Sequence, residues 1–113
     1  MPFDEDLAKR TRAVIGGDYA LEEKRMFGGL AFLVNGHMCC GISGDDLMVR
    51  VGPDIYERAL KRPNARPMDF TGRPLRGFLY VAPEGCRTAA QLKGWVKLGL
   101  DFVLSLPAKQ RPS

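Results

Sequence analysis

The sequence contains 113 residues, of which 45% are hydrophobic and 27% are charged. This is the length of one domain, and the composition excludes a disordered chain. The net charge of +4 is spread along the chain without a block of like charges, which argues against a dedicated nucleic-acid-binding tail. No apolar run approaches the roughly 18–20 residues of a membrane helix, and the acidic N-terminus lacks the pattern of a signal peptide. We therefore expect a cytoplasmic globular domain.

The first predicted element is a helix at residues 4–15. Apolar residues recur there at helical spacing, and Asp4 is a residue type that caps helix N-termini. Gly16 and Gly17 end this helix, because glycine readily adopts the left-handed conformation of a helix C-terminus.

Four strands are predicted next, and they form an antiparallel meander. Asn35-Gly36 is a strong hairpin signal, because a type I′ turn requires positive φ at both central residues. Gly28-Gly29 leads into a strand rather than a helix, so it is interpreted as a tight turn and not as a phosphate-binding loop. The four predicted strands are Glu22–Phe27, Leu30–Val34, His37–Ile42 and Leu47–Val51.

The Asn35-Gly36 turn also predicts the register of the two strands that it joins. Residues at equal distance from the turn face each other, and successive residues point to opposite faces of the sheet. The predicted pairs are Val34 with His37, Leu33 with Met38, Phe32 with Cys39, and Ala31 with Cys40.

The remaining elements complete an α+β domain at residues 1–106, followed by a polar tail at 107–113. Gly52-Pro53-Asp54 opens a second helix that Pro63 stops, and a short edge strand (65–70) and a further strand (76–82) follow. Thr88 to Gln91 has the sequence of a capping box, and the helix that it starts ends at Pro107. The order of helix, four strands, helix, two strands and helix predicts an antiparallel sheet with packed helices.

The three cysteines, Cys39, Cys40 and Cys86, are predicted to be buried and reduced. Cys39 and Cys40 are neighbours on a strand, so they are expected to point to opposite faces. His37 is the single histidine and no Cys-x-x-Cys spacing occurs, so no metal site is predicted. No residue is predicted to be catalytic or to bind a cofactor, because nothing in the sequence orients His37 toward Cys39.

Five arginines lie in or beside predicted strands. If these strands are neighbours, the arginines form a basic face that binds phosphate groups; the alternative is that they are solvated or paired with nearby aspartates. The arginines are Arg25, Arg50, Arg66, Arg73 and Arg76.

The methionines and the tryptophan are predicted to belong to the core. Met26, Met38, Met48 and Met68 are expected to fill gaps between helix and sheet, or alternatively to form a soft surface for a partner. Trp95 is expected to pack in the core from the last helix.

Several motifs, taken in order, resemble the signature of the TfoX/Sxy N-terminal domain family. They are Lys24-Arg25-Met26-Phe27-Gly28-Gly29-Leu30-Ala31-Phe32, then Asn35-Gly36-His37-Met38, then Leu47 to Gly52, then Arg66 to Pro74, then Gly77 to Val81. The resemblance extends from about Asp4 to Leu106 and is most distinctive from Met26 to Leu33.

The resemblance implies an α+β fold similar to that of secretion chaperones. It also implies a non-enzymatic module that binds a transcription regulator or RNA polymerase, because the bacterial regulators that name the family act with the cyclic-AMP receptor protein at competence promoters. Those regulators carry a second, helical domain, and this chain is expected to represent the first domain alone. The positions expected to matter for interaction or structure are Arg25, Met26, Phe27, Gly28, Gly29, Arg50, Arg73 and Arg76.

Three other functions remain open at this point. The arginine-bearing strands predict direct nucleic-acid binding as one alternative. A pocket between sheet and helices would indicate a small ligand-binding or enzymatic domain. The strand Leu30–Val34 is apolar throughout, which is consistent either with a homodimer or with burial on both faces.

Overall fold

The computed structural model describes residues 3–17, 19, 21–26, 28–69, 72 and 75–107. Its elements follow the predicted order, with a short 3-10 turn added before the last helix. In chain order they are α1 (Glu5–Ile15), β1 (Leu21–Met26), β2 (Gly29–Val34), β3 (His37–Ser43), β4 (Asp46–Arg50), α2 (Tyr56–Leu60), β5 (Ala65–Pro67), β6 (Phe78–Val81), η1 (Pro83–Gly85) and α3 (Ala89–Leu104). None of the helices within these ranges is long and apolar enough to cross a membrane.

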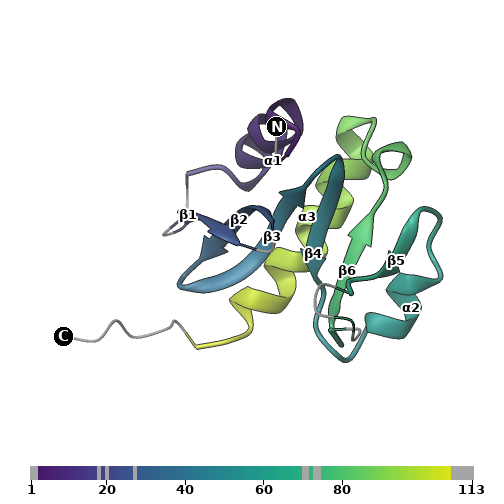
Figure 1. Cartoon of the computed structure of the whole chain (residues 1–113). Helices are drawn as coiled ribbons and strands as arrows, with labels where there is room; N and C mark the ends of the chain where they lie inside the picture. Colours follow the sequence, from purple (N-terminus) through teal and green to yellow (C-terminus); the bar gives the residue numbers. More distant parts are fainter. Residues whose placement is uncertain are drawn as a thin grey trace.

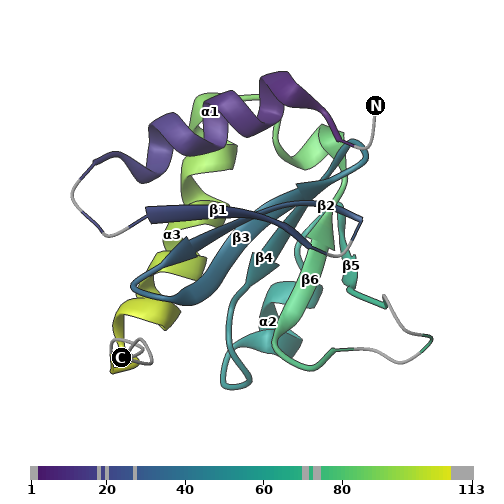
Figure 2. The same cartoon turned by 60° about the vertical axis from the view of Figure 1, so that its left-hand side comes forward.

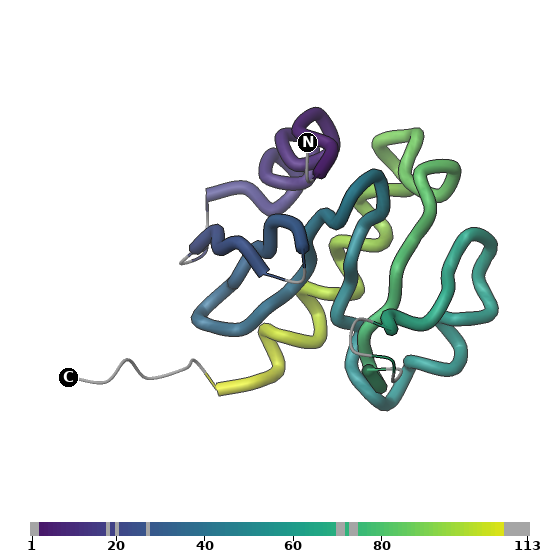
Figure 3. The backbone as a smooth tube through the Cα atoms, viewed as in Figure 1, coloured from purple at the N-terminus to yellow at the C-terminus, as the bar shows by residue number. Residues whose placement is uncertain are grey.

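The six strands form one antiparallel sheet in the order β1-β2-β3-β4-β6-β5 (Figure 1). The helix α3 runs along one face of this sheet, and α1 packs beside it (Figure 2). The tube in Figure 3 shows that the end of α3 reaches the β2–β3 hairpin, where His37 Nε2 lies 2.7 Å from the carbonyl oxygen of Pro107. The strands β1 and β5 form the two edges, and β5 is the short edge strand predicted from Pro67.

Capping side chains explain where α1 and α3 begin. The side chain of Asp4 accepts hydrogen bonds from the backbone N–H groups of Asp6 and Leu7, at 2.9 and 3.1 Å. The predicted capping box is present in α3: Gln91 N donates to Thr88 Oγ1, and Thr88 N donates to Gln91 Oε1, both at 3.0 Å. These bonds satisfy backbone donors that have no partner within the helix.

One face of the sheet, here called the helix face, carries the main core. The buried apolar side chains of all three helices contribute to it, together with alternate residues of β2, β3, β4 and β6. At Gly99 of α3 the helix approaches the sheet so closely that an added Cβ would lie 2.8 Å from the carbonyl oxygen of Cys39. A residue with a side chain at this position would push α3 away from β3.

A β-bulge in β3 corrects the predicted register. Val34 pairs with His37 and Leu33 pairs with Met38, as predicted, but Phe32 pairs with Cys40 and leaves Cys39 as the extra residue. The expectation that Phe32 faces Cys39 and Ala31 faces Cys40 was therefore wrong. A bulge inserts one residue into one strand and shifts every pair beyond it.

The bulge also places both neighbouring cysteines in the core of the helix face, so the expectation of opposite faces was wrong. The hydrogen bond with Cys39, together with complete burial, raises the pKa of the Cys40 thiol. Burial raises the pKa of Cys86 to about 11. All three cysteines are buried and free, as predicted, and the raised pKa values keep Cys40 and Cys86 protonated at neutral pH.

The opposite face of the sheet, here called the methionine face, carries a second and smaller cluster. Its buried members are Ala31, Leu33, Met38, Met48 and Met68. No buried side chain of a described helix belongs to this cluster, so the prediction that these methionines lie between helix and sheet was wrong. The strand β2 is buried on both faces within one chain, which accounts for its continuous apolar sequence.

Candidate interaction groove

The turn between β1 and β2 has the tight geometry that its glycines predict. Gly28 has a φ of +74°, which is a conformation that favours glycine. A Cβ on Gly29 would overlap the backbone carbonyl of Ile42 on β3. Met26 is partly buried at the margin of the methionine face, and Phe27 lies outside the described residues. Both glycines therefore have a structural reason to be there, independent of any partner.

The strand-borne arginines of the described residues do not all lie on one surface. The Arg25 guanidinium lies 5.8 Å from the Phe3 ring, on the side of α1. The Arg66 guanidinium is 2.6 Å from an Asp46 carboxylate oxygen and 4.8 Å from the Tyr80 ring, on the methionine face. Arg25 and Arg66 thus stand on opposite faces of the sheet, and a single basic face that includes both is excluded.

Arg50 occupies a third environment. Its guanidinium lies 5.3 Å from the centre of the Phe78 ring and 5.2 Å from that of Phe102, and burial lowers its pKa. These contacts make Arg50 part of the packing at one end of the sheet. Arg76 is exposed, and Arg73 lies outside the described residues.

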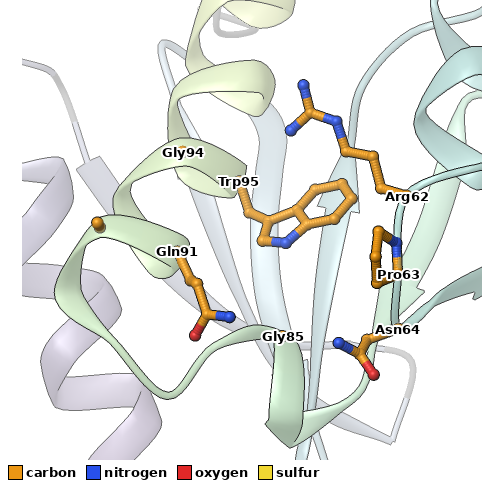
Figure 4. Close-up of a pocket in the computed structure, with 8 residues that line it drawn as sticks. Arg62, Pro63, Asn64, Gly85, Gln91, Gly94 and Trp95 are labelled. Carbon is orange, nitrogen blue, oxygen red and sulfur yellow. The ribbon is translucent and has the colours of Figure 1, made fainter.

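A groove opens on the surface between the end of the α2 segment and the first turns of α3 (Figure 4). Its volume is about 270 Å³, which is room for one or two side chains of a bound molecule. The sequence left open a pocket between the sheet and the helices. This groove lies outside that packed layer. The groove, here called the Trp95 groove, is lined by Arg62, Pro63, Asn64, Gly85, Ala90, Gln91, Gly94 and Trp95.

The wall formed by Arg62 to Asn64 is shaped by a turn. Asn64 adopts a left-handed conformation with a φ of +70°, and its carbonyl oxygen accepts a 2.9 Å hydrogen bond from Ala82 N. Asparagine tolerates this conformation better than most residues. The turn therefore holds the side chains of Arg62 and Asn64 beside the groove rather than within β5.

The opposite wall belongs to α3 and to the turn that precedes it. The capping box fixes Gln91, and its Nε2 also lies 3.4 Å from the carbonyl oxygen of Glu84. Gly94 leaves this wall open, because an added Cβ would meet nothing within 4 Å. Glycine in a helix interior costs roughly 0.5–1 kcal/mol relative to alanine. An exposed glycine inside a helix, such as Gly94, is therefore a sequence feature that could have indicated the groove.

Trp95 joins the groove to the core. It is only 6% exposed and packs in the helix-face core, as predicted. The Arg62 guanidinium lies 5.2 Å from its ring centre. Figure 4 shows the indole nitrogen on the side of the ring toward Gly85 and Gln91, and no acceptor for it occurs among the described residues. One rigid aromatic ring thus forms the floor of the groove and carries an unused donor.

A family model supplies the remaining comparison. The TfoX N-terminal domain model matches residues 19–103. The chain belongs to the TfoX N-terminal domain family. The match includes the whole sheet and nearly all of α3, so it spans both the methionine face and the Trp95 groove of this TfoX domain. Comparison with curated proteins and comparison with solved structures each give no match.

Proposed function

We propose that this TfoX domain is a non-enzymatic protein-interaction module of transcription regulation, and that it docks a segment of its partner in the Trp95 groove. The observation that carries the proposal is the groove itself, where an aromatic floor and polar side chains meet on the surface. Tryptophan and arginine are the residue types that most often dominate the energy of protein interfaces. The link to transcription rests on what membership of the family implies.

The geometry of the groove favours a chain segment over a flat interface. The groove is open, and Asn64 supplies an amide group beside the Trp95 ring, whereas the Gln91 amide is held by Thr88 N and the Glu84 carbonyl oxygen. Amide groups match the donors and acceptors of a peptide backbone. Because Trp95 is anchored in the core, this surface loses little conformational entropy when a partner binds.

The test compares the wild-type chain with a variant whose groove is filled. An added Cβ at Gly94 meets nothing within 4 Å, so the ring of Gly94→Phe is expected to fill the groove. Ala89→Phe is the matched control, because Ala89 is an exposed small residue of the same helix that does not line the groove. Tagged chains capture partners from a host lysate with and without nuclease, and mass spectrometry identifies them.

The expected result is a nuclease-resistant transcription regulator or polymerase subunit with the wild type and with Ala89→Phe, but not with Gly94→Phe. Titration calorimetry with the purified partner then gives binding at least about tenfold weaker for Gly94→Phe. Equal affinity of wild type and Gly94→Phe would exclude the groove as the docking site. Partners that disappear with nuclease would favour nucleic-acid binding instead.

A further inference from the structure

We infer that the Trp95 groove selects an acidic segment of a protein partner, with an aspartate or glutamate carboxylate at Arg62 and backbone groups at Asn64 and Trp95. This inference rests on the proposed function, since it names the ligand of the same groove. It is carried by the polar groups that the fold brings to the groove and leaves without partners in the described part of the chain.

Five arginines of the described residues lie over an aromatic ring, and two of them also bind a carboxylate. Arg12 and Arg66 each stand over a ring and also bind a carboxylate, Glu23 and Asp46 respectively, at 2.6 Å. Arg62 stands over Trp95 in the same way, yet no carboxylate of the described residues binds its guanidinium. Arg25 and Arg50 also lie over rings without a carboxylate of the described residues, but of these three arginines only Arg62 lines the groove, so the position for an acid is open there.

Stacking on Trp95 prepares Arg62 for this role. A guanidinium held over a ring keeps its N–H groups at the edge, where two of them can donate in parallel to one carboxylate. Arg62 itself is exposed, whereas Trp95 is fixed in the core. The ring thus restricts a long side chain that would otherwise lose freedom on binding.

The other end of the groove suits a peptide backbone. Trp95 Nε1 is a donor without an acceptor in the described residues, and the Asn64 side-chain amide has no hydrogen-bond partner there either. An indole N–H binds a carbonyl oxygen, and a primary amide binds both a carbonyl and an N–H group. In Figure 4 the Arg62 guanidinium lies on the opposite side of the Trp95 ring from Asn64 and Gln91, so the occupant is elongated.

The charges around the groove favour a peptide carboxylate over a nucleic-acid backbone. Among the described residues no acidic side chain lines the groove, so none of them repels a carboxylate there. Arg62 is also the only cationic residue that the described part of the chain contributes to the lining, whereas nucleic-acid binding requires contacts with several successive phosphates. One guanidinium together with the Asn64 amide therefore favours a carboxylate on a peptide over a nucleic-acid backbone.

The single tryptophan of the chain provides the measurement, because Trp95 is the only source of tryptophan fluorescence. The full chain is titrated with a blocked hexapeptide that contains two glutamates, and with versions that carry glutamine or lysine in their place. We expect a saturable change in Trp95 fluorescence with the acidic peptide. The glutamine version should bind at least about tenfold more weakly, because a hydrogen bond to a charged group is lost.

Three variants assign this preference to Arg62. Arg62→Gln should bind the acidic and the glutamine peptides equally, and Arg62→Lys should restore only part of the preference, because lysine lacks the planar fork. Arg58→Gln is the control, since Arg58 is exposed, does not line the groove and carries the same charge. It should behave as the wild type. Thermal melts of all variants verify that the fold is retained.

Several outcomes would overturn the inference. Equal affinity for acidic and glutamine peptides, or no saturable binding of either, would exclude acidic selection. Displacement of the peptide by oligothymidylate at lower concentration would show a nucleic-acid site. If the peptide tests fail but the wild type binds a protein partner that Gly94→Phe does not bind, the proposed docking function still stands. The failure of acidic selection is therefore distinguishable from the failure of the docking function.

Discussion

The helix face of the sheet is packed by aliphatic and aromatic side chains against three helices, whereas the buried cluster of the methionine face contains no residue of a described helix. On the helix face, α3 approaches β3 within contact of the Cys39 backbone at Gly99. On the methionine face, an added Cβ at Gly41 would overlap the backbone carbonyl of Leu30 on β2 and would also lie 2.8 Å from Met48 Cε. The helix face thus depends on close approach of a helix to the sheet, and the methionine face on flexible side chains that fill irregular space.

This difference explains where the Trp95 groove lies. A binding site needs side chains whose positions are already fixed by packing. Trp95 belongs to the helix-face core, and packing in that core fixes the position of the groove floor. The methionine face has adaptable side chains at its margin, including Met26, and would suit a less selective contact.

The largest expected effect comes from truncating neighbouring residues of β2 that point to opposite faces. Phe32→Ala removes a fully buried ring from the helix face and should lower the free energy of unfolding by about 3–5 kcal/mol. Leu33→Ala, on the methionine face, should cost less, about 2–3 kcal/mol, because the methionines can move into the space. Urea unfolding measures both. An equal or larger cost for Leu33→Ala would contradict the difference between the faces.

The close approach of α3 can be tested at two glycines of the same helix. Gly99→Val forces a side chain against the Cys39 carbonyl and should destabilise the fold by about 1–3 kcal/mol. Gly94→Ala meets nothing within 4 Å and should stabilise it by about 0.5–1 kcal/mol, because alanine favours the helix. Thermal unfolding compares the two variants. A neutral Gly99→Val would mean that α3 is not fixed by this contact.

A third comparison uses Met48 and Val49, which are adjacent on β4 and point to opposite faces. Met48→Leu nearly conserves volume on the adaptable face and should cost less than about 1.5 kcal/mol. Val49→Leu adds a methylene group to the helix-face core and should cost about 1–3 kcal/mol. Urea unfolding again gives both values. If Met48→Leu proved the more damaging, the methionine face would be the more tightly packed of the two.

The hairpin and the end caps could be predicted because their signals are local. Asn35-Gly36 carries the turn in its own two residues, and both have positive φ. The bulge at Cys39 could not be predicted, because no glycine or proline marks it and it depends on how β3 packs beneath α3. Every register pair inferred beyond it was therefore shifted by one residue.

The methionines and the groove were missed for a different reason. Alternation in β2 and β4 shows that two faces exist, but both faces are apolar, so the pattern does not tell which one the helices cover. The groove combines residues 62–64, 85, 90, 91, 94 and 95, which are brought together only by the tertiary fold. Trp95 was predicted correctly as a core residue, yet its second role requires knowing that Arg62 stands over it.

The smallest expected effect concerns the ion pair that joins α1 to β1 at the surface of the helix face. Arg12 Nε lies 2.6 Å from a Glu23 carboxylate oxygen, and the hydrogen bond from Arg12 lowers the pKa of Glu23. A lowered pKa in the folded state stabilises the fold above the ordinary carboxyl pKa of about 4.3, and this stability is lost as the pH falls through the folded-state value.

Glu23→Gln should therefore cost about 0.2–1 kcal/mol at about pH 7, since both side chains are partly exposed, and nothing at about pH 2. Urea unfolding of wild type and variant across this range gives the difference directly. A difference that persisted in acid would contradict the electrostatic origin. It would point instead to the packing of Arg12 over the Phe32 ring, whose centre lies 5.8 Å from the guanidinium carbon, and so to a contribution from the helix-face core itself.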